Sequence, residues 1–122
     1  MFNNYGKDVV KMNVYDTANR LAQEIKQSEE YNNYKMAKET LNINSELKNK
    51  ITEFEKKRYE TQLEAMQTGK NNQEKLKEMQ DLYAELIHND IAQKYFDAEM
   101  KFNVIIADVN KIIGEAIQDV LK

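Results

Sequence analysis

The sequence predicts an all-α fold, a bundle of about five helices built around a long antiparallel helical hairpin. The composition is the first observation behind this prediction, because the 122 residues include no Pro and only three Gly. Most of the abundant residue types, such as Glu, Lys, Ala, Leu, Gln and Met, lose little rotamer freedom in a helix. The second observation is that apolar residues recur at spacings of three and four, as on one face of a helix. A sheet protein of this length would carry more Gly and Pro at its turns.

Charge and composition narrow the classes of function. The net charge is −3, and acidic and basic residues are interleaved. The chain therefore lacks the basic stripe that binds phosphates, and we expect no direct nucleic-acid binding. Without Cys there are no disulfides or thiolate-bound metals, which fits a cytoplasmic location. No secretory apolar segment opens the sequence, and no apolar run approaches the ~20 residues that span a bilayer. We expect no membrane association.

The length fits a single domain, which we place at residues 13–122. Residues 1–12 show no helical pattern and are expected to form a flexible N-terminal arm. Asn13 can cap the first helix and Ser28 the second, where Glu29 and Glu30 would lie at the positive end of the helix dipole. The apolar stripe of the first helix is Val14, Ala18, Leu21, Ala22 and Ile25.

The third predicted helix begins after Asn44 or Ser45, either of which can cap it. Arg58 lies in its apolar stripe, so we expect the stem to pack while the guanidinium reaches a carboxylate. The stripe is Leu47, Ile51, Phe54 and Ala65, and a second, rotated apolar patch consists of Tyr59, Leu63 and Met66.

Gly69 suits the left-handed residue that ends a helix, and Asn71 or Asn72 suits the next cap. This Gly-marked turn between two long periodic segments predicts the tip of a helical hairpin. The returning helix carries Leu76, Met79, Tyr83 and Leu86. Asn89 is then expected to cap the last helix.

The last predicted helix has two apolar faces separated by polar strips, whereas a surface helix of a monomer needs only one. The simplest interpretation is that one face packs on its own chain and the other contacts a second chain. The alternative is a central helix buried within one subunit. The first face is Ile91, Tyr95, Ala98, Phe102, Ile105, Ile106, Val109 and Ile113, and the second is Phe96, Met100, Val104 and Ala107.

We therefore predict an oligomer interface, formed by a dimer or a tetramer, from the second face of the last helix and the rotated patch of the third. Tyr and Met are typical of protein interfaces, because Tyr offers a large contact area with a polar tip and Met packs adaptably. The candidate interface residues are Phe96, Met100, Val104, Ala107, Tyr59, Leu63 and Met66.

The sequence gives only weak evidence for a catalytic or metal-binding site. Glu85 and His88 have the Glu-x-x-His spacing of di-iron bundles, but those sites need two such pairs and two further glutamates. His88 is the only His in the chain, and it lies where its helix should end. Glu29 and Glu30 are explained by their place in a first helical turn. We predict no catalytic residue, no metal ligand and no cofactor, and hence no enzyme.

The order of these elements resembles the YlbF/YmcA family of small bacterial regulators, which includes YheA-like proteins. The resemblance covers roughly residues 13–121. It rests on a Gly69 turn after a long helix containing Phe54, and on Ile91, Ala98-Glu99 and the apolar run 104–113. It also rests on the segment Ala18-x-x-Leu21-Ala22-x-x-Ile25-x-x-Ser28-Glu29-Glu30-Tyr31-x-x-Tyr34-x-x-Ala37.

The resemblance implies self-association into dimers or tetramers and a regulatory or adaptor role without catalysis, through contacts with other regulatory proteins. In that family YlbF and YmcA act with YaaT in competence, sporulation, biofilm development and RNA processing by RNase Y. Some of their complexes hold iron–sulfur clusters on cysteines, which this chain lacks. Two alternatives stay open: a helical bundle that binds a metal or small ligand, and a chaperone-like structural hairpin.

Overall fold

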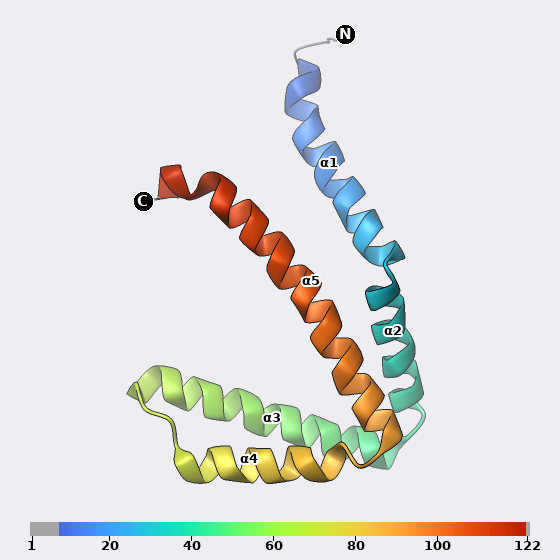
Figure 1. Ribbon diagram of the computed structural model, residues 1–122, viewed down its shortest axis with the longest axis vertical. Helices are drawn as coiled ribbons and strands as arrows, with labels where there is room; N and C mark the ends of the chain where they lie inside the picture. The colour runs from blue at the N-terminus through green and yellow to red at the C-terminus, as the bar shows by residue number, and fades with distance from the viewer. Residues whose placement is uncertain (1–7, 122) are drawn as a thin grey trace. The chain divides into compact units, whose positions relative to one another are not determined.

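The structure is a computed structural model that describes the backbone of residues 8–121 and the side chains of residues 13–121. Every regular element in this part of the chain is a helix, in the order α1 to α5 (Figure 1). The predicted all-α class is confirmed. The chain divides into two units, Met1–Asn33 and Tyr34–Lys122.

The first unit contains α1 (Asp8–Gln27) and the start of α2 (Glu29–Asn42). Because α1 begins at Asp8, Asn13 lies inside the helix, and the prediction that it caps the helix is wrong. Residues 8–12 contain neither Pro nor Gly, so nothing in their sequence breaks a helix. The predicted arm is therefore helical over these residues, and residues 1–7 lie outside the described part.

Ser28 joins α1 to α2. Its hydroxyl donates to the Ile25 carbonyl (2.6 Å) and accepts from the Tyr31 backbone N–H (3.1 Å). One side chain thus hydrogen-bonds a carbonyl in the last turn of α1 and an N–H group in the first turn of α2. Helix ends leave such groups unpaired. The predicted cap is confirmed.

The helical hairpin lies in the second unit and consists of α3 (Ser45–Thr68) and α4 (Gln73–Leu86), which run antiparallel (Figure 1). Asn44 caps α3 by accepting from the Leu47 N–H (3.2 Å), and Asn72 caps α4 by accepting from the Lys75 N–H (3.1 Å). Gly69 ends α3 with φ 73°, a left-handed conformation that costs Gly little. The predicted hairpin and its tip are confirmed.

The last helix, α5, spans Asp90–Leu121. Asn89 caps it by accepting from the N–H groups of Ile91 (2.9 Å) and Ala92 (3.2 Å). The first turns of α5 join the open end of the hairpin and the end of α2 in one hydrophobic core. Its buried residues are Leu41, Leu47, Ile51, Phe54, Leu86, Ala92, Tyr95 and Phe96.

Aromatic rings organise this core. The Phe96 ring lies 5.5 Å from the Phe54 ring, edge to face, and 5.2 Å from the Tyr83 ring. On the other side of α5, Tyr34 of α2 lies 5.8 Å from Tyr95 and 5.5 Å from Phe102. Such pairs add to the burial of apolar area, so the start of α5 is held on two sides. None of the described helices is long and apolar enough to cross a membrane.

Candidate protein-binding surface

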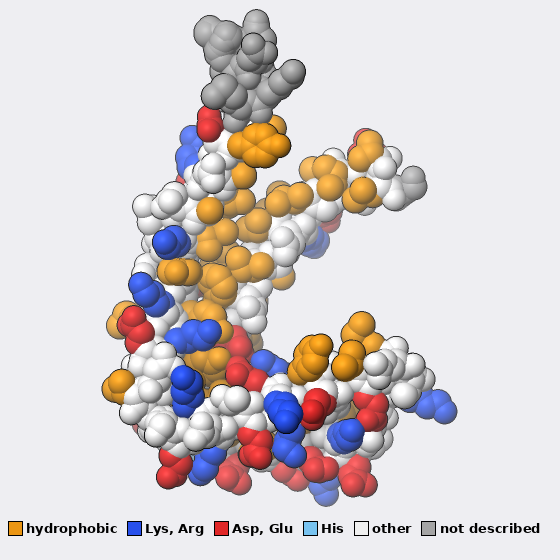
Figure 2. All heavy atoms as spheres, turned by 180° about the vertical axis from the view of Figure 1, so that it is seen from behind, with side chains coloured by type: hydrophobic (Ala, Val, Ile, Leu, Met, Phe, Trp, Pro, Cys, Tyr) orange, Lys and Arg blue, Asp and Glu red, His pale blue; other side chains and the backbone are white. Residues whose placement is uncertain are grey.

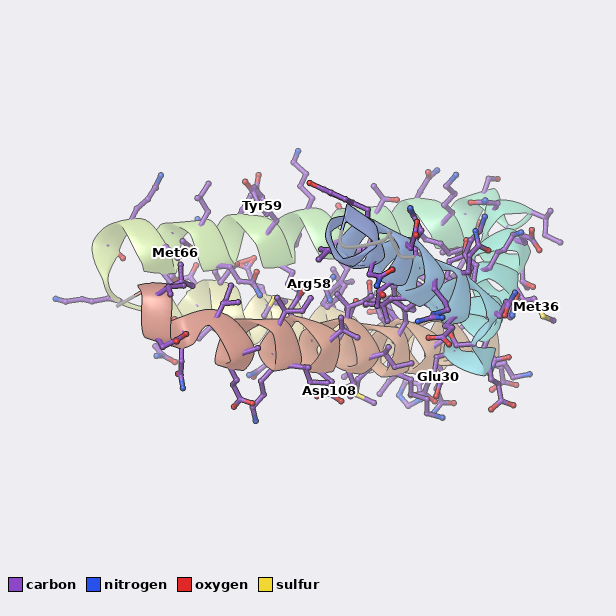
Figure 3. The ribbon with its side chains drawn as sticks, turned by 90° about the horizontal axis from the view of Figure 1, so that it is seen from above. Glu30, Met36, Arg58, Tyr59, Met66 and Asp108 are labelled. Carbon is purple, nitrogen blue, oxygen red and sulfur yellow. The ribbon has the colours of Figure 1, made fainter. Side chains whose placement is uncertain are left out.

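The hairpin carries an exposed apolar patch, the hairpin patch, formed by Tyr59, Leu63 and Met66 of α3. Tyr59 is 65% exposed, Leu63 38% and Met66 82%. Figure 2 shows hydrophobic atoms gathered along the edge of the hairpin from which α5 leaves, and mostly charged atoms along the opposite edge. Figure 3 places Met66 close to the C-terminal end of α3 and Tyr59 further back on the same helix. The rotated patch predicted from the sequence is thus exposed in the part of the chain that the structure describes.

A second exposed apolar group, the α5 patch, consists of Met100, Val104 and Ala107. Met100 is 59% exposed and Val104 53%, and Ala107 is also exposed. These residues continue the face of α5 that includes Phe96, which packs on the hairpin. Past that contact, the residues of this face are exposed over Met100, Val104 and Ala107.

Phe96 does not belong to an exposed face. It is only 6% exposed and lies in the core between Phe54 and Tyr83. The helical pattern correctly separated two apolar faces of α5, but it could not show that the hairpin covers one and Tyr34 of α2 the other over the first turns. For these turns the alternative interpretation, a helix buried within one subunit, describes the structure. The six other candidate residues form the two exposed patches.

Arg58 and Glu99 connect the two patches, because Tyr59 follows Arg58 and Met100 follows Glu99. The Arg58 Nη1 lies 3.7 Å from the Glu99 Oε1, and the guanidinium carbon lies 5.5 Å from the Phe54 ring centroid. The prediction that the Arg58 guanidinium reaches a carboxylate is confirmed, and the guanidinium is also the part of the side chain that lies over the Phe54 ring. The pair is thus a contact between α3 and α5 next to one residue of each patch.

Tyr95 makes a polar contact that the sequence does not reveal. Its hydroxyl donates to the Glu55 Oε2 at 2.9 Å, across 40 residues of sequence. Burial raises the pKa of the Tyr95 phenol well above its ordinary value, and the hydrogen bond to Glu55 raises it further. Glu55 alone resembles a solvated residue on a charged helix, so only the tertiary structure identifies the pair.

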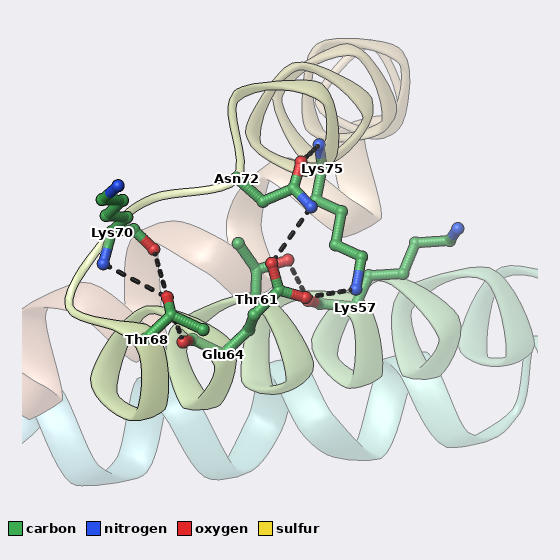
Figure 4. Close-up of polar contacts among 7 residues, drawn as sticks. All are labelled: Lys57, Thr61, Glu64, Thr68, Lys70, Asn72 and Lys75. Carbon is green, nitrogen blue, oxygen red and sulfur yellow. Dashed lines mark hydrogen bonds and ion pairs between the residues drawn. The ribbon is translucent and has the colours of Figure 1, made fainter.

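A polar cluster ties the hairpin tip together (Figure 4). Glu64 accepts hydrogen bonds from the Lys75 ammonium (2.7 Å) and the Asn72 amide (3.0 Å). These bonds lower the pKa of the Glu64 carboxyl, and the same pairing raises the pKa of the Lys75 ammonium. The Thr68 hydroxyl donates to the Glu64 carbonyl at 2.9 Å. The cluster joins the end of α3 to the start of α4.

A shallow depression of about 90 Å³ lies beside this cluster, lined by Lys57, Glu60, Thr61, Lys75 and Glu78. Thr61 is buried, but its hydroxyl already donates to the Lys57 carbonyl at 2.7 Å. Lys75 is engaged by Glu64. The lining thus mixes both charges, and its one buried polar side chain is satisfied, so we assign it no ligand.

The described residues contain no group of three His, Cys, Asp or Glu side chains placed to hold a metal ion. The helix α4 ends at Leu86, and His88 lies in the following turn, where its backbone N–H donates to the Glu85 carbonyl at 3.3 Å. A di-iron pair needs both side chains on one helix face. Glu85 and His88 are not arranged in this way.

The family model described as control of competence regulator ComK, YlbF/YmcA, matches residues 14–118. The chain belongs to the YlbF/YmcA family. It is 40% identical over 110 residues to a UPF0342 protein of Desulfitobacterium hafniense, covering 90% of this chain and 89% of that one. A UPF0342 protein of Caldicellulosiruptor bescii is 35% identical, covering 87% and 89%. One from Symbiobacterium thermophilum is 34% identical, covering 85% and 93%.

Membership confirms the resemblance drawn from the helix caps and apolar spacing. The YlbF/YmcA description is that of a regulatory family. The match spans both units of the chain and includes all six exposed residues of the two patches.

Proposed function

We propose that this protein is a regulator that acts by binding protein chains, its own copies included, and that it works without catalysis. The observation that carries the proposal is the pair of exposed apolar patches, Tyr59, Leu63 and Met66 on α3 and Met100, Val104 and Ala107 on α5. Contiguous apolar surface of this kind marks interaction sites in proteins.

The free energy gained by burying the two patches favours their binding to another protein chain. Burying one large apolar side chain contributes about 1.5–3 kcal/mol, and the two patches together expose five. Part of that gain is offset by the freedom that associating chains lose, which costs several kcal/mol. The binding free energy that is left after this cost suits a reversible complex. A regulator needs such a complex, because it must bind and release its partners.

The arrangement also suits specific binding. Each patch begins next to a member of the Arg58–Glu99 pair, since Tyr59 follows Arg58 and Met100 follows Glu99, and the Glu99 side chain is only 14% exposed. Apolar anchors beside fixed charges give an interface both affinity and register. The rigid helices that carry them need little ordering on binding, which lowers the cost of association.

The family supports the same function. Its description names control of a competence regulator, which favours a regulatory output through other proteins. The described residues offer no metal-binding group that would favour a chemical role. Neither alternative from the sequence, a ligand-binding bundle or a general chaperone, gains a specific observation.

The experiment compares three proteins by sedimentation equilibrium: wild type, Met66→Asp/Met100→Asp, and the control Gln67→Asp/Gln118→Asp. Both double variants add two carboxylates at exposed positions on the same two helices. We expect wild type and control to share a mass above that of one chain, and the Met variant to have a lower mass with unchanged helicity. An unchanged mass for the Met variant would remove the patches from the oligomer interface.

In cells the same variants test the regulatory role. Each would replace the native gene, and competence development would be measured at equal protein levels, because the family description points to this output. The Met variant should lose regulation and the control should keep it. Full regulation by the Met variant would contradict the proposal.

A further inference from the structure

The last three turns of α5 are exposed although they are rich in apolar residues. Every residue from Asn110 to Leu121 is exposed. In Figure 1 this end of α5 extends away from the hairpin, and Figure 2 shows hydrophobic atoms along it. By helical spacing the apolar residues lie within one half of the helix circumference. We call them the C-terminal face: Ile112, Ile113, Ala116, Ile117, Val120 and Leu121.

This segment has the properties of a binding helix. Val120 is 76% exposed and Ile112 68%, and exposed apolar surface of this kind marks interaction sites. Ile and Val are weaker helix formers than Leu or Ala, and most helices in proteins gain their stability from packing an apolar face. The C-terminal face therefore gains both burial and helix stability from a partner.

The charges beside the C-terminal face are mostly acidic. Residues 104–121 carry three acids, Asp108, Glu115 and Asp119, and one base, Lys111, which gives a net charge of −2. By helical spacing the three acids follow one flank of the face, next to Ile112, and Lys111 lies further round the helix, away from the face. Figure 3 shows Asp108 projecting from the side of α5.

These carboxylates are available to a partner. No ion pair in the described part of the chain engages Asp108, Glu115 or Asp119. Lys101 lies on the same flank, but it precedes Asp108 by seven residues, about 10 Å along the helix. The opposite flank is uncharged and consists of Asn110, Gly114 and Gln118.

We propose that the C-terminal face binds an amphipathic helix of another protein, whose apolar side is bordered by Lys or Arg. The inference rests on the proposed function, because it names the chemistry of one protein chain that this regulator binds. It also adds a binding site that is separate from the hairpin patch and the α5 patch.

The spacing of the face favours a helical partner. Ile113, Ala116 and Val120 follow one another at intervals of three and four, the repeat that lets the side chains of a second helix pack between them. An extended peptide would instead bind through backbone N–H and C=O groups. Along α5 those backbone groups are already paired within the helix.

The acidic flank favours a basic border on that helix. Opposite charges at the rim of an interface speed association and fix its register. The same carboxylates repel nucleic acids and anionic membranes, which carry phosphate charges. A second copy of this chain does not supply a basic border, because its own C-terminal face carries the same acids.

The test uses two fluorescent synthetic helices of about 18 residues, roughly 27 Å long. Both carry a leucine face with intervals of three and four. The basic probe has lysines along both flanks of that face, and the acidic probe has glutamates in their place. Fluorescence anisotropy should show that wild type binds the basic probe about tenfold more tightly, and less tightly as salt is added. No binding of the basic probe, or equal binding of both probes, would overturn the proposal.

A matched pair of variants separates the face from the net charge of the protein. Glu115→Lys/Asp119→Lys should weaken binding of the basic probe about tenfold and strengthen binding of the acidic probe. The control Asp81→Lys/Glu85→Lys makes the same charge change at exposed residues of α4 with the same spacing, and it should leave both affinities unchanged. Equal effects of the two variants would show a response to net charge alone and overturn the proposal.

A third variant tests the apolar part of the site. Ile112→Gln/Val120→Gln should weaken binding of the basic probe and keep the helicity of the protein, since Gln is a better helix former than Ile or Val. Binding equal to that of wild type would contradict the proposal, because the probe would then be held by charge alone.

Sedimentation equilibrium distinguishes this site from self-association. Met66→Asp/Met100→Asp should bind the basic probe as wild type does, and Glu115→Lys/Asp119→Lys should keep the mass of wild type. A lower mass for the Lys variant would show that the C-terminal face joins copies of this chain, and would overturn the inference. A wild-type protein that has the mass of one chain and still binds the basic probe would contradict the proposed self-association and leave the inference in place.

Discussion

Arg58 on α3 and Glu99 on α5 form an ion pair, with Nη1 3.7 Å from Oε1, at the point where α5 leaves the hairpin. The Arg58 side chain is 36% exposed and that of Glu99 14%. Because the guanidinium also lies over the Phe54 ring, this contact joins the hydrophobic core to the two exposed patches. The direction of α5, and therefore the position of its apolar residues, depends in part on this pair.

A double-mutant cycle with Arg58→Met and Glu99→Gln measures the strength of this pair. We expect a coupling energy of about 0.2–1 kcal/mol, since solvent screens the partly exposed guanidinium. Arg58→Met also removes the guanidinium from over the Phe54 ring, but this loss occurs with and without Glu99 and therefore cancels in the cycle. Urea denaturation of the four proteins supplies the values, and zero coupling would show that the pair does not fix α5.

The two apolar faces of α5 should differ sharply in their effect on stability. Phe96→Ala removes a buried ring that packs on Phe54 and Tyr83, and we expect it to lower the free energy of unfolding by about 3–5 kcal/mol. Val104→Ala changes an exposed side chain, and we expect less than about 1 kcal/mol. Both are measured by urea denaturation at one protein concentration, because association adds to stability. Equal losses would contradict the assignment of Phe96 to the core.

Tyr95 should make the fold sensitive to alkali. Its folded pKa is raised by burial and by the bond to Glu55, while the unfolded value stays near the ordinary 10.0. A raised folded pKa means that the stabilisation is complete below pH 10 and is lost as the pH rises above it. Tyr95→Phe should therefore show a shallower loss of stability above pH 10 than wild type, whereas the exposed control Tyr59→Phe should match wild type. Identical alkaline profiles for all three proteins would refute this role.

Glu64 should respond in the opposite direction. Its folded pKa lies below the ordinary value of 4.5, because Lys75 and Asn72 hydrogen-bond the charged carboxylate. The stabilisation is present above pH 4.5 and is lost as the pH falls through the folded pKa. Carboxyl titration by NMR should show a lowered pKa for Glu64 that returns towards 4.5 in Lys75→Met. An ordinary Glu64 pKa in the wild type would mean that the tip cluster does not form in solution.

The helix ends were predictable because capping is local. Ser28, Asn89 and Gly69 each act on backbone groups within four residues, so their roles follow from short stretches of sequence. The exception is the start of α1, where Asn13 resembled a cap although no residue before it prevents a helix.

Contacts between distant segments were not predictable in the same way. The Tyr95–Glu55 bond joins residues 40 positions apart, and neither residue type identifies the other. Phe96 is a second case in which the sequence does not identify the contact. Its spacing places it on an apolar face, but whether that face packs on the hairpin or on a second chain depends on the tertiary arrangement.

Sedimentation equilibrium of the unmodified protein over a wide range of concentrations tests the central claim most directly. A chain that works by binding other chains, its own copies included, should show a mass of more than one chain that falls on dilution. The mass of a single chain at every concentration would contradict the account, because the patches on α3 and α5 would then remain exposed in the isolated protein.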